Sequence, residues 1–79
     1  MELKGTIVRS LAGHDAGDLY YVADTEGDVL LLTDGKRKRL SRLKRKRRKH
    51  VELTGYSIGE VIGDGQLRRA LAAYRDVRR

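Results

Sequence analysis

The sequence predicts a mainly β fold, a small β-barrel followed by one C-terminal α-helix. Short segments rich in Val, Ile, Leu and Tyr alternate with turns that contain Gly or Asp up to about residue 55. Beyond that point the apolar residues recur at helical spacing. Four or five short strands are too few for a sandwich, and 79 residues leave room for one small core. We expect a single domain, with residues 1–55 forming the barrel and residues 56–79 a helical extension of it.

Three strands are expected in the first part of the chain. Residues 5–11 (GTIVRSL) contain a β-branched run and break at Ala12-Gly13. Residues 18–23 (DLYYVA) form the second strand, and residues 29–33 (VLLLT) form the third. Because the apolar residues of the third strand do not alternate with polar ones, we expect it to be buried on both faces.

The turns between these strands carry specific signals. Gly13 and Gly17 bound the connection AGHDAG, where each glycine can take a positive φ without steric cost. Residues 24–27 (DTEG) form a tight turn by composition. Asp34-Gly35 is the two-residue signal of a type I′ turn, which needs positive φ at both positions. We assign Gly13, Gly17, Asp34 and Gly35 a structural role in turns.

The type I′ turn predicts that the chain reverses directly after the third strand. Residues 36–40 are expected to return antiparallel to residues 29–33 as a fourth strand. Residues 41–49 have few apolar anchors, so we expect them to project as an extended loop or a short helical turn. Residues 50–53 (HVEL) alternate polar and apolar side chains and form a short last strand, which tethers the loop at its far end.

The C-terminal part has the pattern of an amphipathic helix over residues 66–77, with Asp64 as its N-cap. Its apolar face consists of Leu67, Ala70, Leu71, Tyr74 and Val77. Its opposite face carries Arg68, Arg69, Arg75 and Arg78. Residues 57–60 match a capping box, although Gly59 limits any helix there to a turn or two.

The basic residues are concentrated in residues 36–49, which read KRKRLSRLKRKRRK and are called the basic segment below. It holds 11 of the 18 Lys and Arg residues and no acid. Residues 1–35 carry two basic and seven acidic residues, and residues 50–79 carry five and four. The formal net charge of +7 is therefore the product of one segment. Such a segment repels itself unless a polyanion neutralises it.

Several function classes have little support. There is no cysteine, and two histidines far apart in sequence make no convincing metal site, so we expect no cofactor. No Ser-His-Asp pattern, phosphate-binding glycine loop or spaced carboxylate set is present, so we expect no enzyme. The longest apolar run, residues 29–32, is far below the roughly 20 residues that a membrane-spanning helix needs. We expect a cytoplasmic protein without a membrane partner.

Nucleic acid is the favoured polyanion. Each Lys or Arg that contacts a phosphate releases counterions, so affinity should fall steeply with salt. Gln66 is the only amide side chain, which nearly excludes base readout through an Asn or Gln fork. Recognition would then depend on shape and backbone, with arginines better suited than lysines to fork onto phosphates. Tyr20 and Tyr21 must point to opposite faces of their strand, so one of them could stack on a base.

Residues 5–23 resemble a KOW motif: a first strand, a glycine-bounded turn of the form Gly-x-Asp-x-Gly, and a second strand. Residues 3–54 as a whole resemble the small bacterial KOW-domain RNA-binding proteins related to the fourteenth large-subunit ribosomal protein of eukaryotes and archaea. The matching features are Leu32-Thr33-Asp34-Gly35 before the basic segment and Lys49-His50-Val51 after it. The resemblance implies an SH3-like β-barrel that binds ribosomal or other structured RNA. Ala16 departs from the Lys or Arg that this family often has beside the glycine of its turn.

These observations predict a non-enzymatic RNA-binding protein of the ribonucleoprotein or translation class. The predicted RNA-binding residues are the cations of the basic segment and the two histidines: Lys36, Arg37, Lys38, Arg39, Arg42, Lys44, Arg45, Lys46, Arg47, Arg48, Lys49, His50 and His14. Two alternatives remain open, an SH3-like protein-interaction module and a non-specific DNA-binding protein. The C-terminal helix could dock a protein partner through Leu67, Leu71 and Tyr74.

Overall fold

The computed structural model describes residues 3–36, 38, 40–61 and 63–77. Along these residues the elements are β1 (Thr6–Ser10), β2 (Leu19–Glu26), β3 (Val29–Thr33), β4 (Lys44–Arg47), the 3-10 helix η1 (Arg48–His50), β5 (Val51–Ser57) and α1 (Asp64–Val77). The expectation of a mainly β fold with a C-terminal helix is confirmed.

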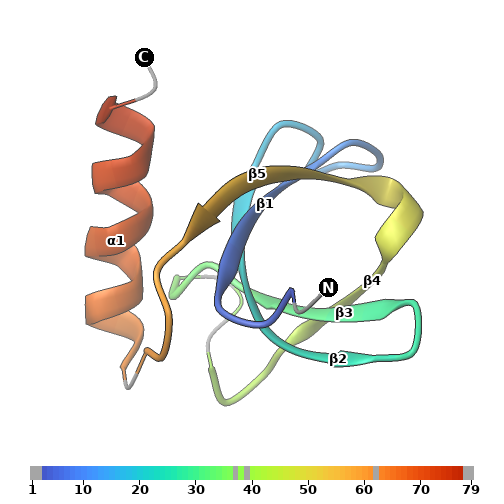
Figure 1. The fold of residues 1–79 in the computed structure, drawn as a ribbon, viewed down its shortest axis with the longest axis horizontal. Coiled ribbons are helices and arrows are strands. Elements are labelled where there is room, and N and C mark those ends of the chain that lie inside the picture. The colour runs from blue at the N-terminus through green and yellow to red at the C-terminus, as the bar shows by residue number, and fades with distance from the viewer. Residues whose placement is uncertain (1–2, 37, 39, 62, 78–79) are drawn as a thin grey trace.

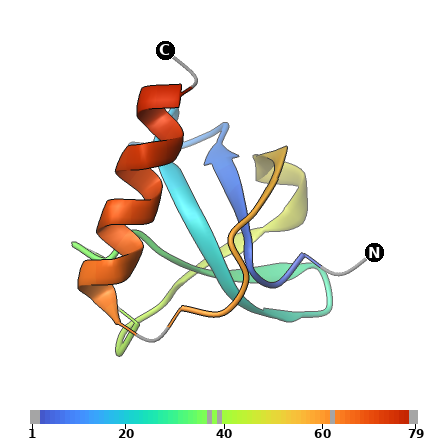
Figure 2. The same ribbon diagram turned by 60° about the vertical axis from the view of Figure 1, so that its left-hand side comes forward.

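The strands form one antiparallel sheet in the order β4-β3-β2-β1-β5. The sheet curves strongly, and α1 lies outside the curve (Figures 1 and 2). The single 3-10 turn of η1 joins the two edge strands, β4 and β5. Among the described residues no ladder pairs β4 with β5, so the sheet is curved but not closed.

Two apolar clusters lie on the two faces of this sheet. One gathers Val8, Tyr20, Val22, Leu30, Leu32 and Val51 inside the curve. The other joins the outer face to α1 through Ile7, Leu19, Tyr21, Leu67, Leu71 and Tyr74. Adjacent Tyr20 and Tyr21 therefore point to opposite faces, as expected, but both are buried, at 4% and 5% exposure. Neither ring is available to stack on a base.

The first three strands agree with the predictions, with small shifts. β2 continues past its expected end, through residue 26, so the turn that we expected over residues 24–27 lies at Gly27 and Asp28 instead. A register shift between Val22 and Asp24 marks a bulge within this longer strand. β3 is not buried on both faces along its whole length, as we expected, because Val29 and Leu31 are half-buried.

The hairpin expected at Asp34-Gly35 is wrong. Gly35 has a φ of +76°, but no described residue other than glycine has a positive φ, so Asp34 does not take the type I′ conformation. The Asp34 carboxylate instead accepts hydrogen bonds from the backbone N–H groups of Lys36 and Lys38, at 2.9 and 3.0 Å. The Thr33 hydroxyl donates to the Lys38 carbonyl. These side chains satisfy the backbone locally, which stabilises a loop rather than a strand.

The fourth strand therefore lies later than predicted. The described residues of 36–40 form no strand, and the strand that pairs with β3 is Lys44–Arg47, inside the segment that we expected to project as a loop. The connection between β3 and β4 spans residues 34–43 and is called the β3–β4 loop below. Arg37 and Arg39 of this loop lie outside the described residues.

The last elements also differ from the predictions. β5 begins at Val51 and is longer than expected, whereas His50 belongs to η1. The prediction that residues 57–60 cap a short helix is wrong, because Ser57 ends β5 and residues 58–61 are irregular. The helix includes Asp64, whose carboxylate accepts a hydrogen bond from the backbone N–H of Leu40 at 2.8 Å. That contact fixes the β3–β4 loop to the start of α1.

Candidate nucleic-acid interface

Asp15 forms a buried anchor for the basic segment. Its carboxylate lies 2.5 Å from the Nζ of Lys44 and 3.2 Å from the Nζ of Lys46. It also accepts hydrogen bonds from the hydroxyls of Ser10, at 2.7 Å, and Tyr20, at 3.0 Å. The Asp15 side chain is 10% exposed and that of Lys46 is 11% exposed. This group, Asp15 with its four partners, is called the Asp15 cluster.

The Asp15 cluster shifts the pKa values of its acidic groups in opposite directions. Burial opposes ionisation of Asp15, but the hydrogen bonds from Lys44, Ser10, Lys46 and Tyr20 outweigh it and hold the pKa of Asp15 well below its usual range. Burial, together with the hydrogen bond to the Asp15 carboxylate, raises the pKa of Tyr20 above its usual range. At neutral pH the cluster therefore holds an ionised carboxylate beside a neutral phenol.

The side chains of β4 alternate between this cluster and solvent. Lys44 and Lys46 point to Asp15, and Lys44 also lies over the ring of Tyr20 with its Nζ 5.8 Å from the ring centroid. Arg45 and Arg47 point outward, where they lie 2.8 and 3.5 Å from the carboxylates of Glu26 and Asp28. Those two outer pairs are more than half exposed, and such pairs contribute little to stability.

Two of the predicted RNA-binding lysines thus have a structural role. Lys44 and Lys46 are partly buried and each forms an ion pair with the Asp15 carboxylate, so their charges are already neutralised within the fold. Sequence reasoning missed Asp15 because it lies 31 residues from Lys46. The available signal was the KRKR alternation, which places two lysines on one face of any strand.

The other described cations of the basic segment are exposed and lie within 4 Å of no described acid: Lys36, Lys38, Arg42, Arg48 and Lys49. They are called the free cations below. Lys36, Lys38 and Arg42 belong to the β3–β4 loop, and Arg48 and Lys49 belong to η1. The basic segment is therefore divided between two places in the fold, with β4 between them.

The predicted turn and histidine residues are placed as follows. Gly13 and Gly17 take φ values of +87° and +92°, which confirms their role in the turn after β1. His14 is exposed in that turn, beside a small cavity that Asp15 and Lys44 also line. His50 is half-buried in η1, and its carbonyl accepts a hydrogen bond from the Leu11 N–H at 2.9 Å.

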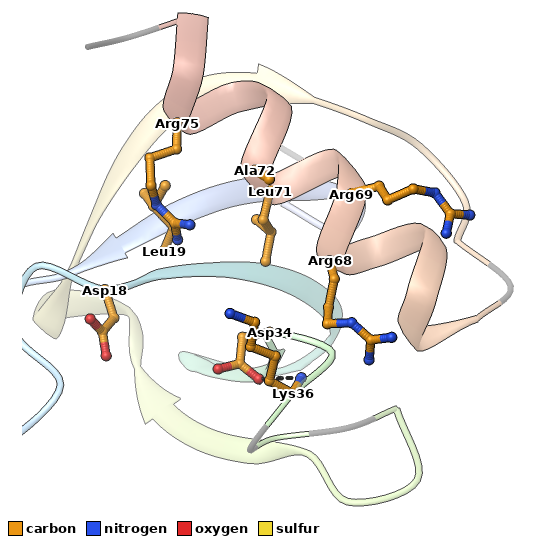
Figure 3. A pocket seen from close by; sticks show the side chains of 9 residues that line it. All are labelled: Asp18, Leu19, Asp34, Lys36, Arg68, Arg69, Leu71, Ala72 and Arg75. Carbon is orange, nitrogen blue, oxygen red and sulfur yellow. Dashed lines mark hydrogen bonds between the residues drawn. The ribbon is translucent and has the colours of Figure 1, made fainter.

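A groove of about 390 Å³ lies between α1 and the β3–β4 loop. Figure 3 shows Arg68 and Arg75 reaching from the helix, with Asp34 and Lys36 across from Arg68. Its lining, called the α1 groove below, consists of Asp18, Leu19, Asp34, Lys36, Arg68, Arg69, Leu71, Ala72 and Arg75. The sequence placed arginines on this helix but gave no sign that the β3–β4 loop would face them.

The three helix residues expected to dock a protein partner are buried inside the domain. Leu67, Leu71 and Tyr74 are buried against the sheet, at 0%, 3% and 5% exposure. Docking through these three side chains, as the sequence suggested, would require the helix to leave the domain. The face that α1 presents to solvent is the arginine face.

Comparisons with known proteins add no assignment. Neither a scan against protein-family models nor a search of curated proteins finds a match.

Within the described residues no group of three or more His, Cys, Asp or Glu side chains is arranged to hold a metal ion. No helix in the same part of the chain has the length and apolar character needed to cross a membrane.

Proposed function

We propose that this protein is a non-enzymatic RNA-binding module of the SH3-like KOW class, acting on ribosomal or other structured RNA in the cytoplasm. The observation that carries the proposal is the set of free cations. The fold neutralises four cations of the basic segment with three acids, Asp15, Glu26 and Asp28, and leaves the described remainder exposed. Like charges gathered on a small domain repel one another, and a bound polyanion would relieve that repulsion.

The arrangement of the strands supports the SH3-like part of the proposal. The chain meanders through β1 to β4, makes one 3-10 turn and returns with β5 beside β1. That order supports the proposal of an SH3-like fold, although no ladder between β4 and β5 closes the described sheet. The positive φ values of Gly13 and Gly17 also suit the glycine-bounded turn of a KOW motif.

RNA is favoured over a protein partner and over DNA by the kind of surface that is exposed. The exposed groups are lysines and arginines, whereas both tyrosines of β2 are buried and the described helix has a single amide side chain, Gln66, that could read base edges in a major groove. Such a surface recognises phosphates and the shape of a folded strand. An acidic protein would offer charge but no regular array of phosphates.

Binding to a structured RNA, to duplex DNA and to polyglutamate at two salt concentrations tests the proposal. We expect RNA to bind most tightly, with log affinity falling linearly with log salt. Equal affinity for RNA and DNA at both salt concentrations would show a general polyanion binder. Tight binding of polyglutamate alone would contradict the proposal.

A further inference from the structure

We propose that the α1 groove binds the sugar-phosphate backbone of RNA, so that the helix is part of the RNA interface and not only a support for the sheet. This inference rests on the proposed function and deepens it. It assigns the contact to a groove formed by α1, the β3–β4 loop and the start of β2, beyond the basic segment itself.

The charge of the groove fits a phosphate chain. Four cations line it, Lys36, Arg68, Arg69 and Arg75, against the two carboxylates of Asp18 and Asp34. The Asp34 carboxylate already accepts two backbone N–H groups of the loop. None of the three arginines lies within 4 Å of a described acid. The groove therefore carries a net positive charge that no described side chain neutralises.

The helical spacing gives the groove a shape suited to a strand. Residues 68, 72 and 75 follow each other at intervals of four and three, so they share one face of α1. Arg68 and Arg75 are two turns apart, roughly 10 Å along the axis. Ala72 lies between them, and its short side chain does not obstruct the approach of a ligand to the helix. A phosphate backbone can approach at Ala72 with an arginine on either side.

The groove is held in shape by contacts between α1 and the β3–β4 loop. The Arg68 Nη1 donates to the Gly35 carbonyl at 2.7 Å, and the Leu40 N–H donates to Asp64 at 2.8 Å. A guanidinium has five N–H donors, so Arg68 keeps others for a ligand. The arrangement is formed before any ligand binds, which lowers the entropy cost of binding.

The carboxylate of Asp18 favours RNA over DNA as the occupant. Asp18 is exposed, and no described group lies within hydrogen-bond distance of its side chain. An ionised carboxylate can only accept hydrogen bonds, and it repels phosphate. The 2′-hydroxyl of RNA offers a donor next to the phosphate, whereas DNA has none. Asp18, which lines the groove together with Arg75, therefore favours the RNA backbone over that of DNA (Figure 3).

The test compares Ala72→Glu with Ala73→Glu, using fluorescence anisotropy with a labelled RNA hairpin. Both alanines are exposed neighbours on α1, and only Ala72 lines the groove. Both variants make the same charge change and keep a good helix former, so circular dichroism should show the same fold for both. We expect Ala72→Glu to weaken binding at least about tenfold through repulsion at the groove, and Ala73→Glu by less than about threefold.

Two further variants sharpen the result. Arg75→Gln should lower the salt slope by about 1, as expected for one lost phosphate contact. Asp18→Ala should reduce the preference for the RNA hairpin over a DNA hairpin of the same sequence. Equal weakening by the two alanine substitutions would overturn the inference about the groove. The proposed function would still stand in that case if charge reversal in the basic segment abolished RNA binding. If the unaltered protein bound no RNA, the proposed function itself would fail.

Discussion

The carboxylate of Asp15 lies 2.5 Å from the Nζ of Lys44, and this ion pair joins the turn after β1 to the edge strand β4. The contact explains why a strand of four consecutive cations can belong to a sheet at all. One face of β4 meets a buried carboxylate, and the other meets exposed acids at Glu26 and Asp28. The basic segment thus contains cations that hold the fold and cations that remain free to bind.

Replacing Asp15 by Asn should destabilise the domain by about 3 kcal/mol, because it leaves two partly buried lysines without their carboxylate. Urea unfolding followed by circular dichroism measures this change in the free energy of unfolding. Asp18→Asn is the matched control, since Asp18 is exposed in the same turn. It should change the free energy of unfolding by no more than about 0.5 kcal/mol. Similar losses for the two variants would contradict the anchoring role of Asp15.

The Asp15 cluster also predicts how stability depends on acid. The pKa of Asp15 is lowered in the folded protein, so its contribution is fully present above the unfolded-state pKa of about 4 and is lost as pH falls below it. The urea midpoint of the unaltered protein should therefore fall toward that of Asp15→Asn below about pH 4. A constant difference between the two midpoints from neutral pH to pH 2 would show that Asp15 does not titrate in this way.

Gly35 should tolerate no side chain. It combines a φ of +76° with close contact to α1, because a Cβ there would lie 2.6 Å from the Asp64 carbonyl oxygen. Gly35→Ala should cost about 3 kcal/mol, from the left-handed backbone and the clash together. Gly27→Ala is the control, since Gly27 also has a positive φ but its Cβ would meet nothing within 4 Å. That variant should cost about 1 kcal/mol in thermal or urea unfolding.

The tyrosines of β2 should resist ionisation. Burial and the contact with Asp15 raise the pKa of Tyr20, and burial raises the pKa of Tyr21. In a spectrophotometric titration, absorbance from these two phenols should appear only above their ordinary pKa of about 10. Tyr20→Phe should remove one late-titrating phenol and leave the early part of the curve unchanged. Loss of early absorbance instead would place Tyr20 in contact with solvent.

The elements predicted well from the sequence are those whose signals are local. β1 follows from a β-branched run, β3 from a continuous apolar run and α1 from helical spacing. The positive φ of Gly13 and Gly17 follows from the glycine-bounded turn between β1 and β2. β4 could not be located in this way, because Lys and Arg alternate there without an apolar pattern. Its position depends on Asp15, far away in the sequence, and on Asp34, whose side chain bonds to the loop where a tight turn was expected.

The sequence predicted the positive charge of the candidate site, but not which of its cations are buried and which are exposed. The sequence showed one basic block, and it could not show that Lys44 and Lys46 turn inward while the loop residues meet the arginines of α1. Arg68 reaches the Gly35 carbonyl across 33 positions of sequence. Only the packing of the helix on the outer face of the sheet brings these residues together.

The most direct test of the account measures RNA affinity after charge reversal at the free cations. Arg48→Glu with Lys49→Glu alters two exposed residues of η1, and Lys4→Glu with Arg9→Glu makes the same change in net charge outside the basic segment. We expect the first pair to weaken binding of a structured RNA at least about a hundredfold and to flatten its salt dependence, with a much smaller effect of the second pair. Equal affinities for the two double variants would contradict the claim that the basic segment binds the RNA.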